Sequence, residues 1–386
     1  MLEKCVINKF LKQLENLKYG SVCVITPEGK KYSFCGQETF LHANLVINDY
    51  RAITNLLAKG DVGFAESYRD GLFDSDNLTN LLTVALKNAE VVDNYLYGGA
   101  LSNITSQILY YMRKNSLKGS RRNIQAHYDL GNDFYSLWLD STMSYSAAIF
   151  NYNNEPMENA QHNKYDRIID RLENNSGNLL EVGCGWGGFA ERAAEKGDYD
   201  IKGITISDRQ HSFAKNRLKD KANVALEDYR YQEGKYDNIV SIEMFEAVGE
   251  KYWSQYFDKM KSLLNKKGKA VVQTITIEEP YFERYRKTGD MVRSFIFPGG
   301  MLPCVSRFKE EAAKKELQVN NVYSFGRDYA TTIVYWLKNF ENNIPKIKSL
   351  NFDDKFIRLW RFYLCACIAS FSAGRTNVIQ AEISHV

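Results

Sequence analysis

Residues 179–188, Leu-Leu-Glu-Val-Gly-Cys-Gly-Trp-Gly-Gly, decide the fold class of this 386-residue chain. The apolar residues at the start of this stretch predict a buried strand, and the glycines after them predict a tight turn that opens a helix over 189–196. Glycine suits such a turn because a Cβ obstructs its dihedral angles and keeps a ligand away from the backbone. Four glycines in six residues therefore predict a ligand-binding turn rather than a plain connection.

The segments that follow repeat this alternation of strands and helices. Short apolar runs predict the strands, and apolar residues at helical spacing predict the helices. The alternation predicts an α/β fold with a parallel, doubly wound, Rossmann-like sheet. The predicted strands cover 178–182, 201–206, 223–226, 238–242 and 269–275, and the predicted helices cover 189–196, 209–218 and 253–264.

The chain is too long for one ordinary hydrophobic core, which predicts two domains. We expect residues 1–110 to form a small α+β domain and residues 111–122 to form a basic linker. Residues 123–386 then form the larger α/β domain that carries the glycine-rich turn.

Four further elements are predicted outside the alternating core. A β-hairpin is expected over 22–36, a turn-rich stretch over 60–77 and a helix over 78–87. A final helix over 356–373 is apolar on most of its faces, so we expect it to be buried or to line an apolar channel, with burial favoured.

The charge of the chain argues against one class of partner. A net charge of only +3 is too small for a broad nucleic-acid-binding surface. Residues 113–122 nevertheless hold five basic side chains and no acidic one. This patch suits an anionic lipid surface, and it equally suits a solvated linker.

The cysteines and the hydropathy pattern indicate a cytoplasmic protein without a structural metal. The seven cysteines are scattered and form no CxxC pair, which predicts reduced thiols and no zinc site. There is no signal-like N-terminus and no run of about 18 apolar residues, so any membrane contact is expected to be peripheral.

The glycine turn also matches GxGxxG, so a dinucleotide is the alternative ligand. A nicotinamide dinucleotide site expects an acid at the end of the second strand, about 20 residues further on. Here that strand ends at Ser207, and the nearest acid follows it. Glu181, just before the glycines, is typical of methyltransferases instead. We therefore predict S-adenosylmethionine as the ligand, held by Glu181, Gly183, Gly185 and Gly187.

Polar residues follow two other strands of the predicted sheet. Thr205, Ser207 and Gln210 follow the second strand, and Asp228 and Tyr229 follow the third. Ligands of open α/β sheets bind beyond the carboxyl ends of the strands. We therefore expect the first group near the ribose or methionine part of the donor, and the second group at the adenine.

Five further segments carry a specific resemblance. They are Ala-His-Tyr-Asp-Leu-Gly-Asn-Asp-Phe-Tyr at 126–135, Met-Ser-Tyr-Ser at 143–146, Glu-Met-Phe-Glu-Ala-Val-Gly at 243–249, Phe-Ile-Phe-Pro-Gly-Gly at 295–300 and Gly-Arg-Asp-Tyr-Ala-Thr-Thr at 326–332. The chain resembles the cyclopropane-fatty-acyl-phospholipid synthases over about residues 60–380, with the mycolic acid cyclopropane synthases as relatives. The resemblance implies a class I methyltransferase that transfers a methylene unit to unsaturated acyl chains of membrane phospholipids, giving cyclopropane fatty acids.

The resemblance also implies roles for individual residues and partners. The residues implied to contact S-adenosylmethionine are Tyr128, Tyr145, Ser146, Gly183, Gly185, Thr205, Gln210 and Tyr229. A bound bicarbonate is implied to act as base, held by a set of residues that comprises Ala147, Glu246, Gln273, Ile275 and Tyr329. The resemblance further implies a homodimer acting at an anionic membrane surface. It implies that the N-terminal domain serves either in dimerisation or in presenting the membrane to the active site.

Two residues of the bicarbonate set depart from the family pattern. Ala147 stands where the family has cysteine, and Gln273 stands where it has histidine. Alanine offers no polar contact, while glutamine forms hydrogen bonds without carrying charge. Bicarbonate binding is therefore in question, and so is ring closure. The alternative product is a methyl- or methylene-branched acyl chain.

Two other functions stay open at this point. A methyltransferase acting on a small soluble molecule shares the donor site and lacks the aromatic surroundings. A non-catalytic lipid-binding homologue has the same fold, and Ala147 and Gln273 lend it some support. Glu246 and Tyr329 count against it.

Overall fold

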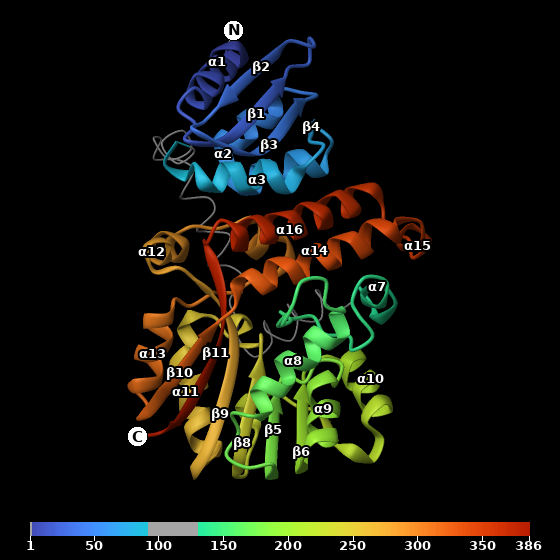
Figure 1. The fold of residues 1–386 in the computed structure, drawn as a ribbon, viewed down its shortest axis with the longest axis vertical. Helices are drawn as coiled ribbons and strands as arrows, with labels where there is room; N and C mark the ends of the chain where they lie inside the picture. The colour runs from blue at the N-terminus through green and yellow to red at the C-terminus, as the bar shows by residue number, and fades with distance from the viewer. Residues whose placement is uncertain (1, 92–129) are drawn as a thin grey trace. The chain divides into compact units, whose positions relative to one another are not determined.

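The computed structural model describes residues 2–91 and 130–386 of the chain (Figure 1). These residues form two compact units, and each unit combines separate stretches of sequence. One unit joins the N-terminal region to Glu283–Pro298 and Ile344–Arg375. The division expected from the sequence assigned both of these segments to the larger domain. Helices in these segments belong to the smaller unit together with the N-terminal region. Sequence position does not reveal such an assignment, because it depends on contacts between residues far apart in the chain.

The larger unit is built on a seven-stranded sheet with the strand order β10-β11-β9-β8-β5-β6-β7. The five predicted strands are confirmed and run parallel to one another. The sheet is not wholly parallel, because β11 pairs antiparallel with both β9 and β10. The strands are β5 Ser176–Val182, β6 Asp198–Thr205, β7 Asn223–Leu226, β8 Tyr236–Ile242, β9 Leu264–Ile277, β10 Leu317–Ser324 and β11 Thr376–His385.

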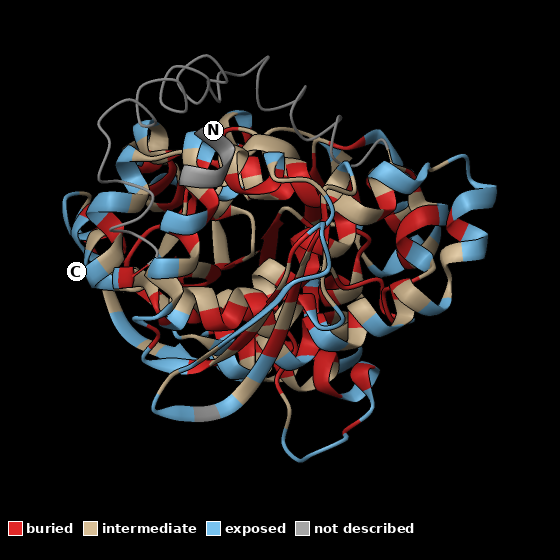
Figure 2. Ribbon diagram, turned by 90° about the horizontal axis from the view of Figure 1, so that it is seen from above, coloured by how far each residue is buried: buried red, intermediate tan, exposed pale blue. Residues whose placement is uncertain are grey.

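Helices cover both faces of this sheet, as right-handed crossovers require (Figure 1). On one face α8, α9 and α10 share a hydrophobic cluster with the strands. On the other face α11 and α13 pack together through Phe257 and Phe308, whose ring centroids lie 5.2 Å apart. These helices are α8 Met157–Ile169, α9 Gly188–Lys196, α10 Asp208–Leu218, α11 Trp253–Leu263 and α13 Val305–Ala313. Buried residues run along the strands and the inner sides of the helices (Figure 2).

Shorter elements and one long helix complete the list of regular structure in this part of the chain. Short 3-10 helices follow the carboxyl ends of β7 and β8, where the sheet exposes its binding edge. They and the remaining helices of this unit are α7 Asn132–Ser136, α14 Gly326–Asn342 and the 3-10 helices Lys219–Lys221, Tyr229–Tyr231, Phe245–Ala247 and Glu250–Tyr252. Helix α12 Glu279–Lys287 begins in the larger unit and ends in the smaller one, to which the π-helix Val292–Ile296 belongs.

The smaller unit holds a four-stranded sheet with the order β2-β1-β3-β4. The predicted hairpin is confirmed: β1 and β2 pair antiparallel, with Val22 opposite Phe34. The stretch over 60–77 was expected to be turn-rich, but α2 continues to Arg69. The helix is interrupted at Gly60, where φ of 61° takes the backbone out of the helical region before the helix resumes. The elements are α1 Leu2–Leu14, β1 Tyr19–Ile25, β2 Lys31–Cys35, β3 Glu38–Ile47, α2 Arg51–Arg69, β4 Phe73–Asp74, α3 Leu78–Lys87, α15 Ile344–Ser349 and α16 Asp354–Ser372.

The predicted final helix is α16, and most of its apolar side chains are buried within the smaller unit. Its Phe362 ring meets the Phe64 ring of α2 edge-on, at a centroid distance of 6.1 Å. Arg358 of the same helix pairs with Asp74 of β4 at 2.7 Å. Across residues 2–91 and 130–386, no helix combines the length and the apolar character needed to cross a lipid bilayer.

Candidate active site

The glycine turn after β5 has the geometry that the sequence predicts. Gly183, Gly185 and Gly187 all have positive φ, at 82°, 53° and 85°. A Cβ on Gly183 would lie 2.9 Å from Cγ of Met244, which is too close for real contacts. A Cβ on Gly185 would meet nothing within 4 Å, so the backbone there faces open space. Glycine is thus needed for the turn itself and for its close approach to the segment after β8.

Glu181 lies at the end of β5, buried directly beneath this turn, with 3% of its surface exposed. One of its carboxylate oxygens, Oε2, has no hydrogen-bond partner among the described residues. Burial raises the pKa of Glu181 to about 8, and the positive charge of Lys164 opposes that rise. A buried oxygen that lacks a donor fits the cationic amino group of a methionine moiety.

The residues predicted after the second strand come together at the start of α10. The Thr205 hydroxyl donates to Oε1 of Gln210 at 2.9 Å, and Ser207 caps the helix by accepting from the Gln210 amide at 3.3 Å. All three are buried at the carboxyl end of β6. They form one polar cluster beside the glycine turn.

The residues predicted after the third strand are also at this edge of the sheet. The Asp228 carboxylate caps the 3-10 helix Tyr229–Tyr231 and pairs with Arg230 at 2.6 Å. The Tyr229 ring packs edge-on against Tyr256 at 5.6 Å, and burial raises the pKa of Tyr229 to about 12. Asp228 thus lies at the carboxyl edge of the sheet, and much of its hydrogen-bonding capacity goes to Arg230.

An aromatic cluster borders the glycine turn. The Trp186 indole donates to Oδ1 of Asn132 at 2.9 Å, and its ring lies 5.1 Å from that of Tyr135. Tyr145 stands 5.5 Å from Tyr135 and 5.3 Å from Trp336 of α14. Tyr128, another predicted donor contact, lies outside the described residues.

Ser146 is held by a buried lysine that sequence reasoning did not single out. Lys164 of α8 is fully buried, and its ammonium donates to the Ser146 hydroxyl at 2.7 Å. Burial lowers the pKa of Lys164 to about 7, opposed by the negative charges of Glu243, Asp140 and Glu181.

Glu243 accepts hydrogen bonds from three residues of the predicted reaction centre. No role for Glu243 was predicted. Oε1 of Glu243 accepts from the Ala147 amide at 2.8 Å and from Nε2 of Gln273 at 2.8 Å. Oε2 accepts from the Tyr329 hydroxyl at 2.5 Å. The prediction that Ala147 offers no polar contact was wrong, because it considered only the side chain and the contact comes from the backbone. The available signal was that Glu243 opens the family-like segment 243–249 directly after a buried strand.

Glu246 lies one turn further along, in the 3-10 helix Phe245–Ala247. Its Oε1 accepts from the Ile275 amide at 2.5 Å, and its Oε2 is buried without a hydrogen-bond partner in the described part of the chain. Burial raises the pKa of Glu246 to about 8, and the neighbouring charge of Glu243 adds to that rise. The structure thus brings together all five residues of the predicted reaction centre, with Glu243 among them.

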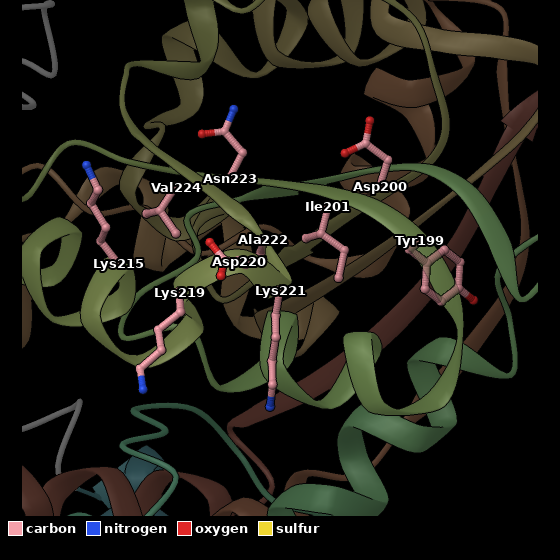
Figure 3. Close-up of a pocket in the computed structure, with 10 residues that line it drawn as sticks. All are labelled: Tyr199, Asp200, Ile201, Lys215, Lys219, Asp220, Lys221, Ala222, Asn223 and Val224. Atoms are coloured by element: carbon pink, nitrogen blue, oxygen red, sulfur yellow. The ribbon is translucent and has the colours of Figure 1, made fainter.

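A cavity elsewhere in the larger unit is unrelated to this site. It measures about 420 Å³ and lies at the beginnings of β6 and β7, whereas the glycine turn lies at the ends of the strands. Figure 3 shows the side chain of Lys215 pointing away from those of Lys219 and Lys221, so the three ammonium groups do not converge on one point.

Comparisons with known proteins agree with this geometry. The profile of the mycolic acid cyclopropane synthetase family matches residues 115–381. The chain is 34% identical over 336 residues to tuberculostearic acid methyltransferase UfaA1 of Mycobacterium tuberculosis, covering 83% of this chain and 78% of that protein. It is 32% identical over 339 residues to cyclopropane-fatty-acyl-phospholipid synthase of Escherichia coli strain K12, covering 85% and 84%. Among solved structures, mycolic acid cyclopropane synthase CmaA1 complexed with SAH and CTAB superposes with a TM-score of 0.64 at 30% identity, covering 68% of this chain and 97% of that one.

The fold, the glycine turn and the buried acid beneath it define an S-adenosylmethionine-dependent methyltransferase. Within that class, the chain belongs to the mycolic acid cyclopropane synthetase family. Glu181, the glycines and the Thr205 cluster are the residues that would hold the donor, which supplies a methyl group on a positively charged sulfur.

Proposed function

We propose that this enzyme transfers a one-carbon unit from S-adenosylmethionine to the cis double bond of an unsaturated acyl chain in a membrane phospholipid, forming a cyclopropane ring. The names of two relatives support this proposal: the Escherichia coli enzyme is a cyclopropane-fatty-acyl-phospholipid synthase, and UfaA1 is a tuberculostearic acid methyltransferase. The enzyme would meet its substrate as a peripheral protein at the inner face of the membrane.

One observation carries the proposal: a pair of buried carboxyl groups lies beside the donor turn. Met244, between Glu243 and Glu246, is the residue that a Cβ on Gly183 would strike. Close by, the Tyr329 ring stands 5.9 Å from that of Trp336, which joins the site to the aromatic cluster.

This arrangement suits an alkene better than a polar substrate. An alkene that attacks the donated methyl group becomes a carbocation, which carboxylates and aromatic faces stabilise in a dry pocket. An amine or a phenol instead becomes a stable product by losing a proton to water, so it needs neither buried carboxylates nor exclusion of water.

The test uses a donor whose methyl group carries three deuterium atoms, together with vesicles of monounsaturated phospholipid. After the reaction, the fatty acids are released and analysed by mass spectrometry, before and after mild hydrogenation. A cyclopropane retains two deuterium atoms and resists hydrogenation, whereas a methylene-branched chain takes up hydrogen. Retention of all three deuterium atoms would show that the proton leaves from another carbon.

The competing functions give different results in the same assay. An enzyme for soluble substrates would leave the lipid unlabelled and methylate a soluble amine or phenol. A non-catalytic homologue would label nothing. Either outcome would overturn the proposal.

A further inference from the structure

We propose that the carboxylate of Glu243 is the base of this enzyme and takes the place in which the resemblance expects bicarbonate. This inference rests on the proposed function, because it concerns the proton that leaves after methyl transfer. It goes beyond that function because the base is then a side chain of the protein. Turnover therefore requires no dissolved anion.

The hydrogen-bond donors of the reaction centre are the first support. Three residues that the resemblance assigns to bicarbonate are Ala147, Gln273 and Tyr329. All three donate to the carboxylate of Glu243 instead, at 2.8, 2.8 and 2.5 Å. Bicarbonate does not fit this arrangement, because its donors are engaged and a further anion would face a buried carboxylate without a new cation.

The backbone at Glu243 is the second support. Its φ is 49°, in the left-handed region that residues with a Cβ rarely adopt. Holding a non-glycine residue there costs about 1–3 kcal/mol, and such strain is concentrated at functional sites. This backbone conformation brings the side chain of Glu243 to the three donors.

The carboxylate also has room for a proton. An ionised carboxylate offers about four acceptor positions. Oε1 uses two of them on Ala147 and Gln273, and Oε2 uses one on Tyr329. The remaining position on Oε2 is the one that can take a proton from the substrate.

Of the two neighbouring carboxyl groups, Glu243 and Glu246, only one is expected to carry a negative charge. Both are buried, and they repel each other when both are ionised. Glu243 accepts three hydrogen bonds on its two oxygens, whereas Oε2 of Glu246 has no hydrogen-bond partner among the described residues. Burial raises the pKa of both carboxyls. Hydrogen bonds to the charged form favour ionisation, so we assign the shared proton to Glu246 and the negative charge to Glu243. Lys164 lies near enough for its positive charge to support the ionised form of Glu243.

The reaction step balances with these groups alone. The π electrons of the alkene form the new carbon–carbon bond as the methyl–sulfur bond breaks, and the positive charge moves from sulfur to a chain carbon. One C–H bond of the new methyl group then breaks, and its electron pair closes the ring. The proton goes to Oε2 of Glu243 and neutralises its negative charge. Ring closure removes the positive charge of the carbocation.

The experiment compares three variants with the full-length enzyme in buffer freed of carbon dioxide. Glu243→Gln keeps the shape but cannot accept the proton. Glu243→Gly suits the positive φ and leaves space for a small anion among the three donors. Glu233→Gln, at an exposed position, is the matched control. Transfer to lipid, donor binding by calorimetry and thermal unfolding are measured for each, with and without added bicarbonate or formate.

We expect the wild-type rate to be unchanged by bicarbonate. Glu243→Gln should lose about 100- to 10,000-fold in turnover, the usual contribution of a general base, while binding the donor as the control does. Glu243→Gly should be slow in the depleted buffer and faster with bicarbonate or formate.

Two results would overturn the inference: a wild-type enzyme that requires bicarbonate, or a Glu243→Gln variant with the wild-type rate. If Glu243→Gln fails to fold or to bind donor, Glu243→Gly decides, and an absence of rescue by either anion counts against the inference. Failure of the proposed function looks different, because then the wild type labels no lipid under any of these conditions.

Discussion

The hydroxyl of Tyr329 offers a direct measure of how the reaction centre holds its charge. This hydroxyl donates to Oε2 of Glu243 at 2.5 Å, and Tyr329 is 5% exposed. The substitution Tyr329→Phe removes the donor and leaves the ring, so packing against Trp336 is preserved. The expected change is a rise in the pKa of Glu243, because the Tyr329 bond is among the contacts that lower it.

The size of the change follows from the strength of the bond. A buried hydrogen bond to a charged group contributes about 1.5–3 kcal/mol. Each 1.36 kcal/mol corresponds to about one pKa unit, so the pKa of Glu243 should rise by about 1–2. Only the ionised fraction reacts, so at pH values below the pKa of Glu243 in both enzymes the rate should fall about 10- to 100-fold. The loss should shrink as the pH rises, because Glu243 then regains its charge. The titratable neighbours Lys164 and Glu246 also influence the pKa of Glu243.

The assay is the pH profile of single-turnover methyl transfer to phospholipid vesicles. Tyr335→Phe, which deletes the same atom on the same helix α14, is the matched control. The acid side of the profile should move to higher pH for Tyr329→Phe only, with donor affinity unchanged. A profile that keeps its position, with a change in KM alone, would refute the reasoning and assign Tyr329 to substrate binding.

Three further substitutions test other parts of the structure. Gly183→Ala should destabilise the fold by about 1–3 kcal/mol and weaken donor binding by calorimetry, because its φ is 82° and the new Cβ would lie 2.9 Å from Met244. Lys164→Met should weaken donor binding roughly tenfold at neutral pH and less at alkaline pH, because losing the positive charge raises the pKa of Glu181 further. Arg358→Met should cost about 1–3 kcal/mol in urea unfolding, because it removes three hydrogen bonds, to the carbonyls of Tyr68 and Phe73 and to the Asp74 carboxylate.

Each of these substitutions has a matched control. Gly29→Ala has a φ of 80° and nothing within 4 Å, so it should destabilise without affecting donor binding. Lys196→Met removes a half-exposed lysine and should leave the pH dependence of donor binding unaltered. Lys355→Met breaks a 3.2 Å surface pair with Asp70 and should cost at most about 1 kcal/mol. Equal effects in a variant and its control would contradict the corresponding explanation.

Local chemistry made much of the larger unit predictable. The strand–glycine turn–helix at 179–188, the five parallel strands and the acid beneath the turn follow from periodicity and from the special dihedral angles of glycine, which nearby residues determine. The amino-acid sequence alone was therefore enough to predict the glycine turn and the buried position of Glu181 beneath it, where we expect the donor. The segments that resemble the family located Glu246, Tyr329, Gln273, Ile275 and Ala147 in the same way.

Only the tertiary structure decided what those residues contact. Glu243, directly after β8, became the centre of the site because β9, α14 and the segment before α8 each bring one donor to its carboxylate. One of these donors is the backbone amide of Ala147, and a backbone amide has no sequence signal. The antiparallel pairing of β11, and the packing of α16 with the N-terminal unit, likewise depend on which apolar surfaces meet across long sequence separations. The periodicity of apolar residues predicts that a surface is buried. Only the folded structure determines which other surface covers it.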